Sequence, residues 1–231
     1  MADNLSAIHV VSSMATRQLL TELAAGFEAT GGLPVKLEAV GGVDAAKRVR
    51  AGETFDVIVL AANVIDALID EGQVIGRRID LVNSPIAVGV RTGVALPDIA
   101  SAEAVRRAVL SAGRVGYSTG PSGTYLAQLF ERWGIGDALK DRIVVAPPGV
   151  PVAALVARGD IDLGFQQLSE LAGAPGVDVI GLLPSEIQYV TTFSGGVART
   201  SGQPDDARHL LEYLASPAGE EIKRRNGMDP A

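Results

Sequence analysis

Ile8-His9-Val10-Val11-Ser12-Ser13-Met14 is the stretch of sequence that decides the fold. Its β-branched first half is typical of a buried strand, and the small hydroxyl residues that follow are typical of a turn into a helix. The next segment, residues 16–27, places its large apolar residues on one helical face: Leu19, Leu20, Leu23 and Phe27. The stretch therefore predicts a strand followed by a helix.

The same alternation of short apolar strands and amphipathic helices continues along the chain. We expect further strands over 35–39, 55–61, 83–90, 114–118, 143–146, 161–166, 177–182 and 188–197. We expect further helices over 44–51, 64–70, 102–111, 124–133, 150–158, 205–215 and 218–225. Repeated units of this kind predict an α/β fold, with mainly parallel sheets and helices on both faces. Extended segments joining two such halves predict two lobes, two hinge strands and a ligand cleft between the lobes.

Composition and charge limit the classes of function. Of 231 residues, 47% are hydrophobic and 20% charged, which is typical of a soluble globular protein, and the net charge of −7 argues against nucleic acid as a partner. The absence of cysteine excludes disulfides and thiolate chemistry. The most apolar stretch, residues 55–69, is interrupted by Asp56, Asn63 and Asp66, so we expect no membrane insertion. The negative charge and the lack of an exposed apolar stripe favour a monomer.

A secretory signal has a positively charged region followed by an apolar one. The first residues, MADNLSAIHVVSS, do not have this pattern. We therefore expect a cytoplasmic protein from the sequence as it begins. If a leader has been removed, the expected location is the periplasm.

Three strand-to-helix turns are rich in glycine and hydroxyl residues: Val11–Met14, Val40–Val43 and Tyr117–Thr124. Each places free backbone N–H groups and the positive end of a helix dipole at one point, which suits a bound anion. Their spacing matches neither a dinucleotide fingerprint nor a phosphate loop. With two distant histidines, His9 and His209, and no clustered carboxylates, we expect neither a metal nor a cofactor.

Other polar groups could complete an anion site. Arg17, one turn into the first helix, could meet a carboxylate. Two adjacent amides, Gln166 and Gln167, end an apolar strand, and a buried amide must find a partner. We expect at least one of the two amides to reach into the cleft.

Several motifs resemble the molybdate-binding proteins of ABC importers. They are Val-Val-Ser-Ser-Met (10–14), Arg-Val-Arg-Ala-Gly-Glu-Thr-Phe-Asp-Val (48–57), Gly-Pro-Ser-Gly-Thr-Tyr-Leu (120–126), Leu-Val-Ala-Arg-Gly-Asp-Ile-Asp-Leu-Gly (155–164) and Ser-Pro-Ala-Gly (216–219). The resemblance covers nearly the whole chain. It implies a class II periplasmic-binding-protein fold, with residues 1–83 and 194–231 in lobe 1 and residues 84–193 in lobe 2.

The resemblance also implies which residues contact the ligand. Ser13 matches the family's first-turn serine, while Ser122 and Gly149 match positions whose backbone amides contact the oxyanion. Gly42 and Gln167 depart from the pattern, because they stand where the family has a serine and a tyrosine. Losing two hydroxyl donors favours a larger organic acid over molybdate. The expected ligand-binding set is Ser12, Ser13, Arg17, Gly42, Tyr117, Ser118, Ser122, Gly123, Gly149 and Gln167.

The chain also resembles the aconitate isomerases of the same superfamily, which leaves two hypotheses open. In the first, the protein binds a small organic carboxylate or oxyanion and releases it unchanged, to an ABC importer if it is exported. In the second, it is a cytosolic isomerase of small unsaturated polycarboxylates that moves a proton along an allylic system. Such an enzyme needs a base, for which Tyr117 and Glu170 are the candidates.

Overall fold

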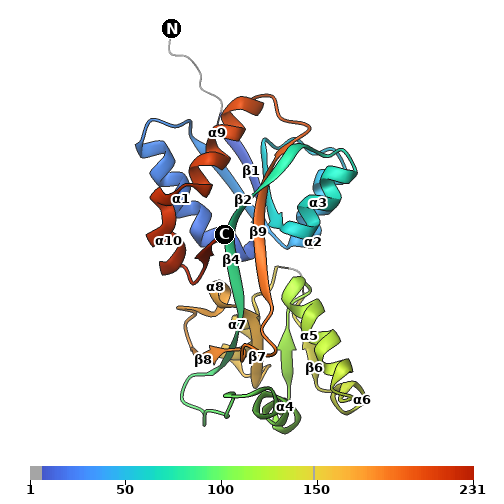
Figure 1. Ribbon diagram of the computed structural model, residues 1–231. Helices are drawn as coiled ribbons and strands as arrows, with labels where there is room; N and C mark the ends of the chain where they lie inside the picture. The colour runs from blue at the N-terminus through green and yellow to red at the C-terminus, as the bar shows by residue number, and fades with distance from the viewer. Residues whose placement is uncertain (1–6, 148) are drawn as a thin grey trace. The chain divides into compact units, whose positions relative to one another are not determined.

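The chain forms two compact units, which a computed structural model describes over residues 7–147 and 149–231 (Figure 1). Unit 1 comprises Met1–Asn83 and Thr192–Ala231, and unit 2 comprises Ser84–Thr191. The chain passes from unit 1 to unit 2 within strand β4 (Val74–Arg91), and returns within β9 (Val190–Ala198). Unit 1 is therefore built from both ends of the chain, and unit 2 from one continuous segment.

The sheet of unit 1 has its parallel strands together and its antiparallel strands beyond them. Its order is β2 (Val35–Val40), β1 (Ile8–Ser13), β3 (Val57–Ala61), β9 and β4. β1 pairs in parallel with β2 and β3, whereas β3 pairs antiparallel with β9, and the short β10 (Asp229–Pro230) pairs antiparallel with β4. The carboxyl ends of β1, β2 and β3 therefore lie at one edge of this sheet.

Helices cover both faces of that sheet. On one face lie α1 (Arg17–Ala29), α9 (Pro204–Ala215) and α10 (Glu220–Arg225), which enclose a core around Leu23, Phe27 and Leu211. On the other lie α2 (Gly42–Arg50) and α3 (Ala62–Asp70), which pack on Ile58 and Leu60. Two 3₁₀ turns, Met14–Thr16 and Pro217–Gly219, precede α1 and α10.

Unit 2 repeats the same plan. Its sheet has the order β6 (Ile143–Val145), β5 (Val115–Tyr117), β7 (Leu163–Gln167), β4 and β8 (Val177–Leu182). β5 is parallel to β6 and β7, and β4 is antiparallel to β7 and β8. The helices are α4 (Ala102–Ser111), α5 (Pro121–Arg132), α6 (Gly136–Leu139), α7 (Val152–Arg158) and α8 (Leu168–Leu171).

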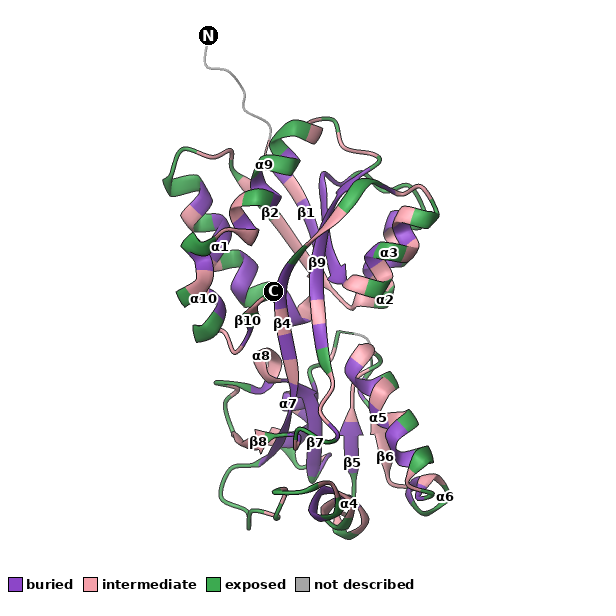
Figure 2. Cartoon of the chain, in the orientation of Figure 1, coloured by how far each residue is buried: buried purple, intermediate pink, exposed green. Residues whose placement is uncertain are grey.

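Burial follows this layered plan, with β3 and β7 buried along their whole length (Figure 2). The predicted α/β fold, with helices on both faces of a mostly parallel arrangement, is confirmed. The structure differs in detail where the apolar pattern is broken. β4 begins at Val74, nine residues before the predicted start at 83, because charged residues at 77, 78 and 80 hide the strand from a hydrophobicity pattern.

Candidate functional site

The first predicted turn, in unit 1, ends β1 with two serines. The Ser13 hydroxyl accepts a hydrogen bond from Ala15 N at 3.3 Å and caps the 3₁₀ turn, which leaves its own hydrogen available for donation. Ser12 is fully buried and donates to Ser13 O at 3.2 Å. Arg17 is exposed at the first position of α1. Ser13 is thus a half-buried hydroxyl donor at the start of a helical segment.

The second predicted turn, also in unit 1, leads from β2 into α2 through two half-buried glycines. Gly41 is the N-cap and Gly42 the first residue of the helix, with no side-chain capping bond. A Cβ at Gly42 would lie 3.9 Å from Leu60 Cδ2, an ordinary van der Waals contact. The position therefore has room for a side chain, and the sequence supplies only backbone there.

The third predicted turn, in unit 2, packs tightly against the start of α5. Ser118 Oγ accepts from Gly120 N at 3.3 Å. A Cβ at Gly123 would lie 1.7 Å from Ser118 O, so only glycine allows the helix to begin this close to the end of β5. Ser122 is 2% exposed in the first turn of α5, where helix N–H groups have no intrahelical acceptor. The turn thus presents a row of donors at the carboxyl end of β5.

Tyr117, the last residue of β5, is half-buried beside the Phe130 ring. Burial raises the pKa of its phenol above the ordinary value, and the negative charge of Glu131 raises it further. Tyr117 therefore keeps its proton at neutral pH and is able to donate a hydrogen bond.

The turn before α7 contains Gly149, whose φ of +76° lies in the left-handed region that favours glycine. Gly149 follows residue 148, which lies outside the described residues. The first N–H of α7, on Val152, is taken by the side chain of Gln166, which accepts it at 3.1 Å. This helix start is therefore capped by the protein itself.

The two amides at the end of β7 are both 2% exposed and both hydrogen-bonded. Gln166 Nε2 donates to Glu170 Oε1 at 2.7 Å, and Gln167 Nε2 donates to Thr191 Oγ1 at 2.7 Å. Gln167 Oε1, however, is buried without a hydrogen-bond partner among the described residues, as is Ser84 Oγ. Gln167 lies opposite Ile86 in the β4–β7 pairing, so Ser84, two residues before Ile86, lies on the same face of the sheet.

Among the described carboxyl groups of unit 2, that of Glu170 has the most strongly shifted pKa. Glu170 is half-buried in the first turn of α8. Burial raises the pKa of its carboxyl to about 7, and the hydrogen bond from Gln166 acts in the opposite direction. A carboxyl group with this pKa exchanges a proton readily near neutral pH, as a general acid or base must.

Sequence reasoning missed Thr191 and Ser84 because no motif marks them among the other polar residues of β9 and β4. Gln166 was singled out, but its link between Glu170 and the first turn of α7 required the structure. Among the described residues, no group of three or more His, Asp or Glu side chains is arranged to hold a metal ion.

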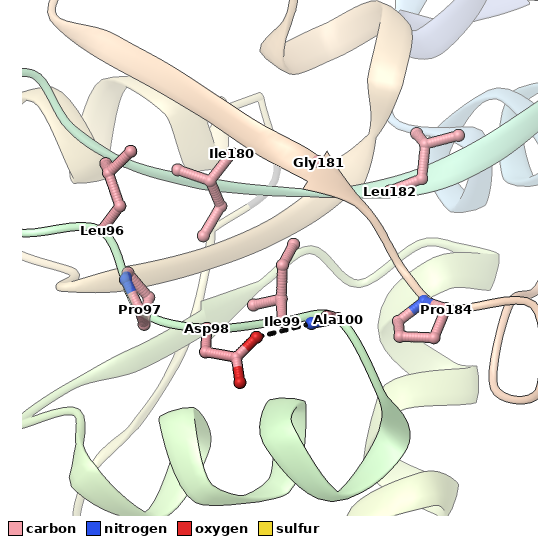
Figure 3. A pocket seen from close by; sticks show the side chains of 9 residues that line it. All are labelled: Leu96, Pro97, Asp98, Ile99, Ala100, Ile180, Gly181, Leu182 and Pro184. Atoms are coloured by element: carbon pink, nitrogen blue, oxygen red, sulfur yellow. Dashed lines mark hydrogen bonds between the residues drawn. The ribbon is translucent and has the colours of Figure 1, made fainter.

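A separate depression lies in unit 2, and none of the predicted site residues lines it (Figure 3). Its volume is about 490 Å³. The lining is Leu96, Pro97, Asp98, Ile99, Ala100, Ile180, Gly181, Leu182 and Pro184. The one carboxylate among these side chains, Asp98, accepts a hydrogen bond from Ala100 N at 2.9 Å. The lining side chains are therefore mainly apolar, and none of them offers a hydrogen-bond donor to an anion.

Comparison with known proteins defines the class. Residues 8–229 match the family of bacterial extracellular solute-binding proteins, and the chain belongs to that family. It is 36% identical to an aconitate isomerase from a Pseudomonas species, in an alignment that covers 99% of this chain and 90% of the relative. Within the described residues, none of the helices has both the length and the apolar character needed to cross a membrane.

Solved structures confirm the predicted class II periplasmic-binding-protein fold. The periplasmic molybdate-binding protein of Azotobacter vinelandii superposes with a TM-score of 0.80 at 18% identity, over 96% of this chain and 98% of that one. The substrate-binding domain of a molybdenum ABC transporter from Clostridium difficile gives a TM-score of 0.73 at 16% identity, over 97% and 98%.

Proposed function

We propose that this protein binds a small unsaturated polycarboxylate, with aconitate as its substrate, and isomerises it. The observation that carries the proposal is the 36% identity to an aconitate isomerase along nearly the whole of both chains. It is supported by a carboxyl group, Glu170, whose pKa is raised to about 7 at the edge of the sheet where donors gather.

The binding groups fall into two sets, one in each unit. In unit 1 the set is Ser12, Ser13, Arg17 and the backbone of Gly42. In unit 2 it is Tyr117, Ser118, Ser122, Gly123 and Gln167, with Gly149 in the next turn. Hydroxyls, backbone amides and one guanidinium suit a ligand with several carboxylates, because each carboxylate accepts several hydrogen bonds.

Rotation of the Gln167 amide would give the ligand one more hydrogen-bond donor. Its buried Oε1 has no hydrogen-bond partner among the described residues. The two ends of an amide are assigned by their surroundings, and rotation by 180° would let Oε1 accept from the Thr191 hydroxyl. Nε2 would then be free to donate to a ligand carboxylate. Gly42 favours an organic acid over a smaller oxyanion, because the absence of a side chain leaves room for a larger ligand.

The chemistry proposed is an allylic proton shift. A base removes a proton from the CH₂ group next to the double bond, the double bond moves by one carbon, and the proton is returned to the carbon at the far end. The product has the same composition, and the new double bond forms with either geometry. Donors on the carboxylates stabilise the negative charge that develops between the two proton transfers.

A second function is favoured by the family itself, whose members are solute-binding proteins. In this alternative the protein binds the anion as a monomer and releases it unchanged, in the periplasm to an ABC importer if it is exported, or in the cytoplasm as a sensor. It predicts tight binding without turnover.

Incubation of the protein with cis- or trans-aconitate in D₂O separates the two functions. The isomerase hypothesis predicts that the two isomers interconvert and that deuterium enters the substrate. Both changes are measured by ¹H NMR. Binding without either change supports the carrier, and molybdate serves as the comparison ligand in a thermal-shift assay. Ser13→Ala should weaken aconitate binding, whereas Ser111→Ala, at an exposed position of α4, is the matched control. If no carboxylate raises the melting temperature, the proposed ligand class is wrong.

A further inference from the structure

Glu170 lies at the edge of unit 2 where the proposed ligand donors are. β5, β6 and β7 are parallel, so their carboxyl ends share one edge of the sheet. Tyr117 and Ser118 end β5 at this edge, and Glu170 lies three residues beyond the end of β7. Ligands of open α/β sheets bind at this edge, next to the carboxyl ends of the strands.

A buried amide holds the Glu170 carboxyl group in place. Gln166 Nε2 donates to Glu170 Oε1 at 2.7 Å, and the other end of the same amide accepts the Val152 N–H at 3.1 Å. Gln166 is 2% exposed, so both ends of its side chain are fixed. Glu170 as a residue is partly exposed, while its carboxyl group lies in the buried surroundings that raise its pKa.

Glu170 and Tyr117, the two candidate bases, differ in their protonation state near neutral pH. Burial raises the pKa of the Glu170 carboxyl to about 7, so both of its forms are populated near neutral pH. Burial and the charge of Glu131 raise the pKa of the Tyr117 phenol, so this group stays protonated. Glu170 is thus able to accept and return a proton, whereas Tyr117 is suited only to donating a hydrogen bond.

We propose that Glu170 carries the proton in the isomerisation, and that Gln166 is the positioning residue that orients its carboxyl group. This inference rests on the proposed isomerase function. Glu170 takes the proton from the substrate CH₂ group, the electron pair of that C–H bond forms the new double bond, and the old π pair accepts the proton back from Glu170 at the far carbon. The carboxylate is regenerated, so no other reactant is needed.

The test compares Glu170→Gln with the wild type and with Glu103→Gln, a control at an exposed position of α4. We expect Glu170→Gln to retain the aconitate-induced thermal shift and to lose at least about 100-fold in both isomerisation and solvent deuterium uptake, as is typical when a general base is removed. Glu103→Gln should behave as the wild type. Glu170→Asp, which keeps the carboxyl group at a shorter reach, should recover part of the exchange.

Two further variants test the roles of Gln166 and Tyr117. Gln166→Met should lower kcat while KM changes by less than about twofold, because the carboxyl group stays but loses its orientation. Tyr117→Phe should raise KM, because the ligand loses a hydrogen-bond donor, and should still exchange deuterium at saturating aconitate. If Glu170→Gln exchanges deuterium as fast as the wild type, or if folded Tyr117→Phe shows no exchange at saturating aconitate, the assignment of Glu170 is overturned. A wild type that neither binds nor isomerises aconitate overturns the proposed function instead.

Discussion

Replacing Glu170 by Gln should change the stability of the protein in a way that depends on pH. The pKa of the carboxyl group is 4.5 in its ordinary state and about 7 in the folded protein. The folded state therefore holds the proton more tightly, so wild-type stability falls as pH rises from 4.5 and levels off above 7. At 1.36 kcal/mol per pKa unit, the full loss is about 3 kcal/mol.

Glu170→Gln cannot ionise, and its side-chain carbonyl still accepts the hydrogen bond from Gln166. The variant should therefore match the wild type near pH 4 and exceed it at pH 8.5. For a chain of this size, 3 kcal/mol corresponds to about 6–12 °C in Tm. Thermal unfolding followed by circular dichroism at half-unit pH intervals measures this difference, with Glu103→Gln as the control. A Tm difference that stays the same from pH 4 to 8.5 would refute the reasoning.

Three other substitutions have defined outcomes. Asp56→Asn should destabilise unit 1 by about 1–3 kcal/mol at pH 7 in urea unfolding. Burial opposes the charge of Asp56, but hydrogen bonds from His9 N, Ser201 and Gln203 outweigh it and hold the pKa below its ordinary value. The loss should therefore shrink as pH falls through that pKa, and a pH-independent loss would contradict this origin. Gly123→Ala should weaken aconitate binding, measured by calorimetry, at least tenfold, because the new Cβ would displace the start of α5. An unchanged affinity would show that the start of α5 does not contribute to the binding site. Gly42→Ser should fold normally and bind aconitate less tightly. The thermal-shift assay measures binding of aconitate and, for comparison, of molybdate. Tighter aconitate binding would contradict the proposed need for space at position 42.

Much of the fold could be predicted from the sequence because each strand–helix unit carries its own local signals. Ser12 and Ser13 end a buried strand, and Pro121 starts a helix, so the turns of both units are marked by residue type alone. The first half of β4 could not be predicted in this way. It carries charged residues and pairs with a distant segment of the chain, Val82 with Pro230, so its hydrogen-bond partners are not local in sequence.

The candidate site was predictable in its turns and unpredictable in its side-chain contacts. Gly123 could be proposed from its turn, but the reason for glycine there is a distance to Ser118 O that only the fold creates. Glu170 was a candidate by location, and its perturbed pKa depends on burial that the local sequence does not encode. The Gln167–Thr191 bond joins residues 24 positions apart, and neither residue type points to the other.

The division of the chain into an interrupted unit and a continuous one sets an order on its synthesis. Every residue of unit 2 has been translated once Thr191 is made, so its core is complete while the C-terminal part of the chain is still to come. Unit 1 must wait for β9, α9 and α10, whose residues Leu210, Leu211 and Leu214 fill the core around α1. Until then β3 has an unpaired edge and α1 an uncovered apolar face. A chain released after about residue 195 should therefore contain a protease-resistant unit 2 beside a protease-sensitive N-terminal segment.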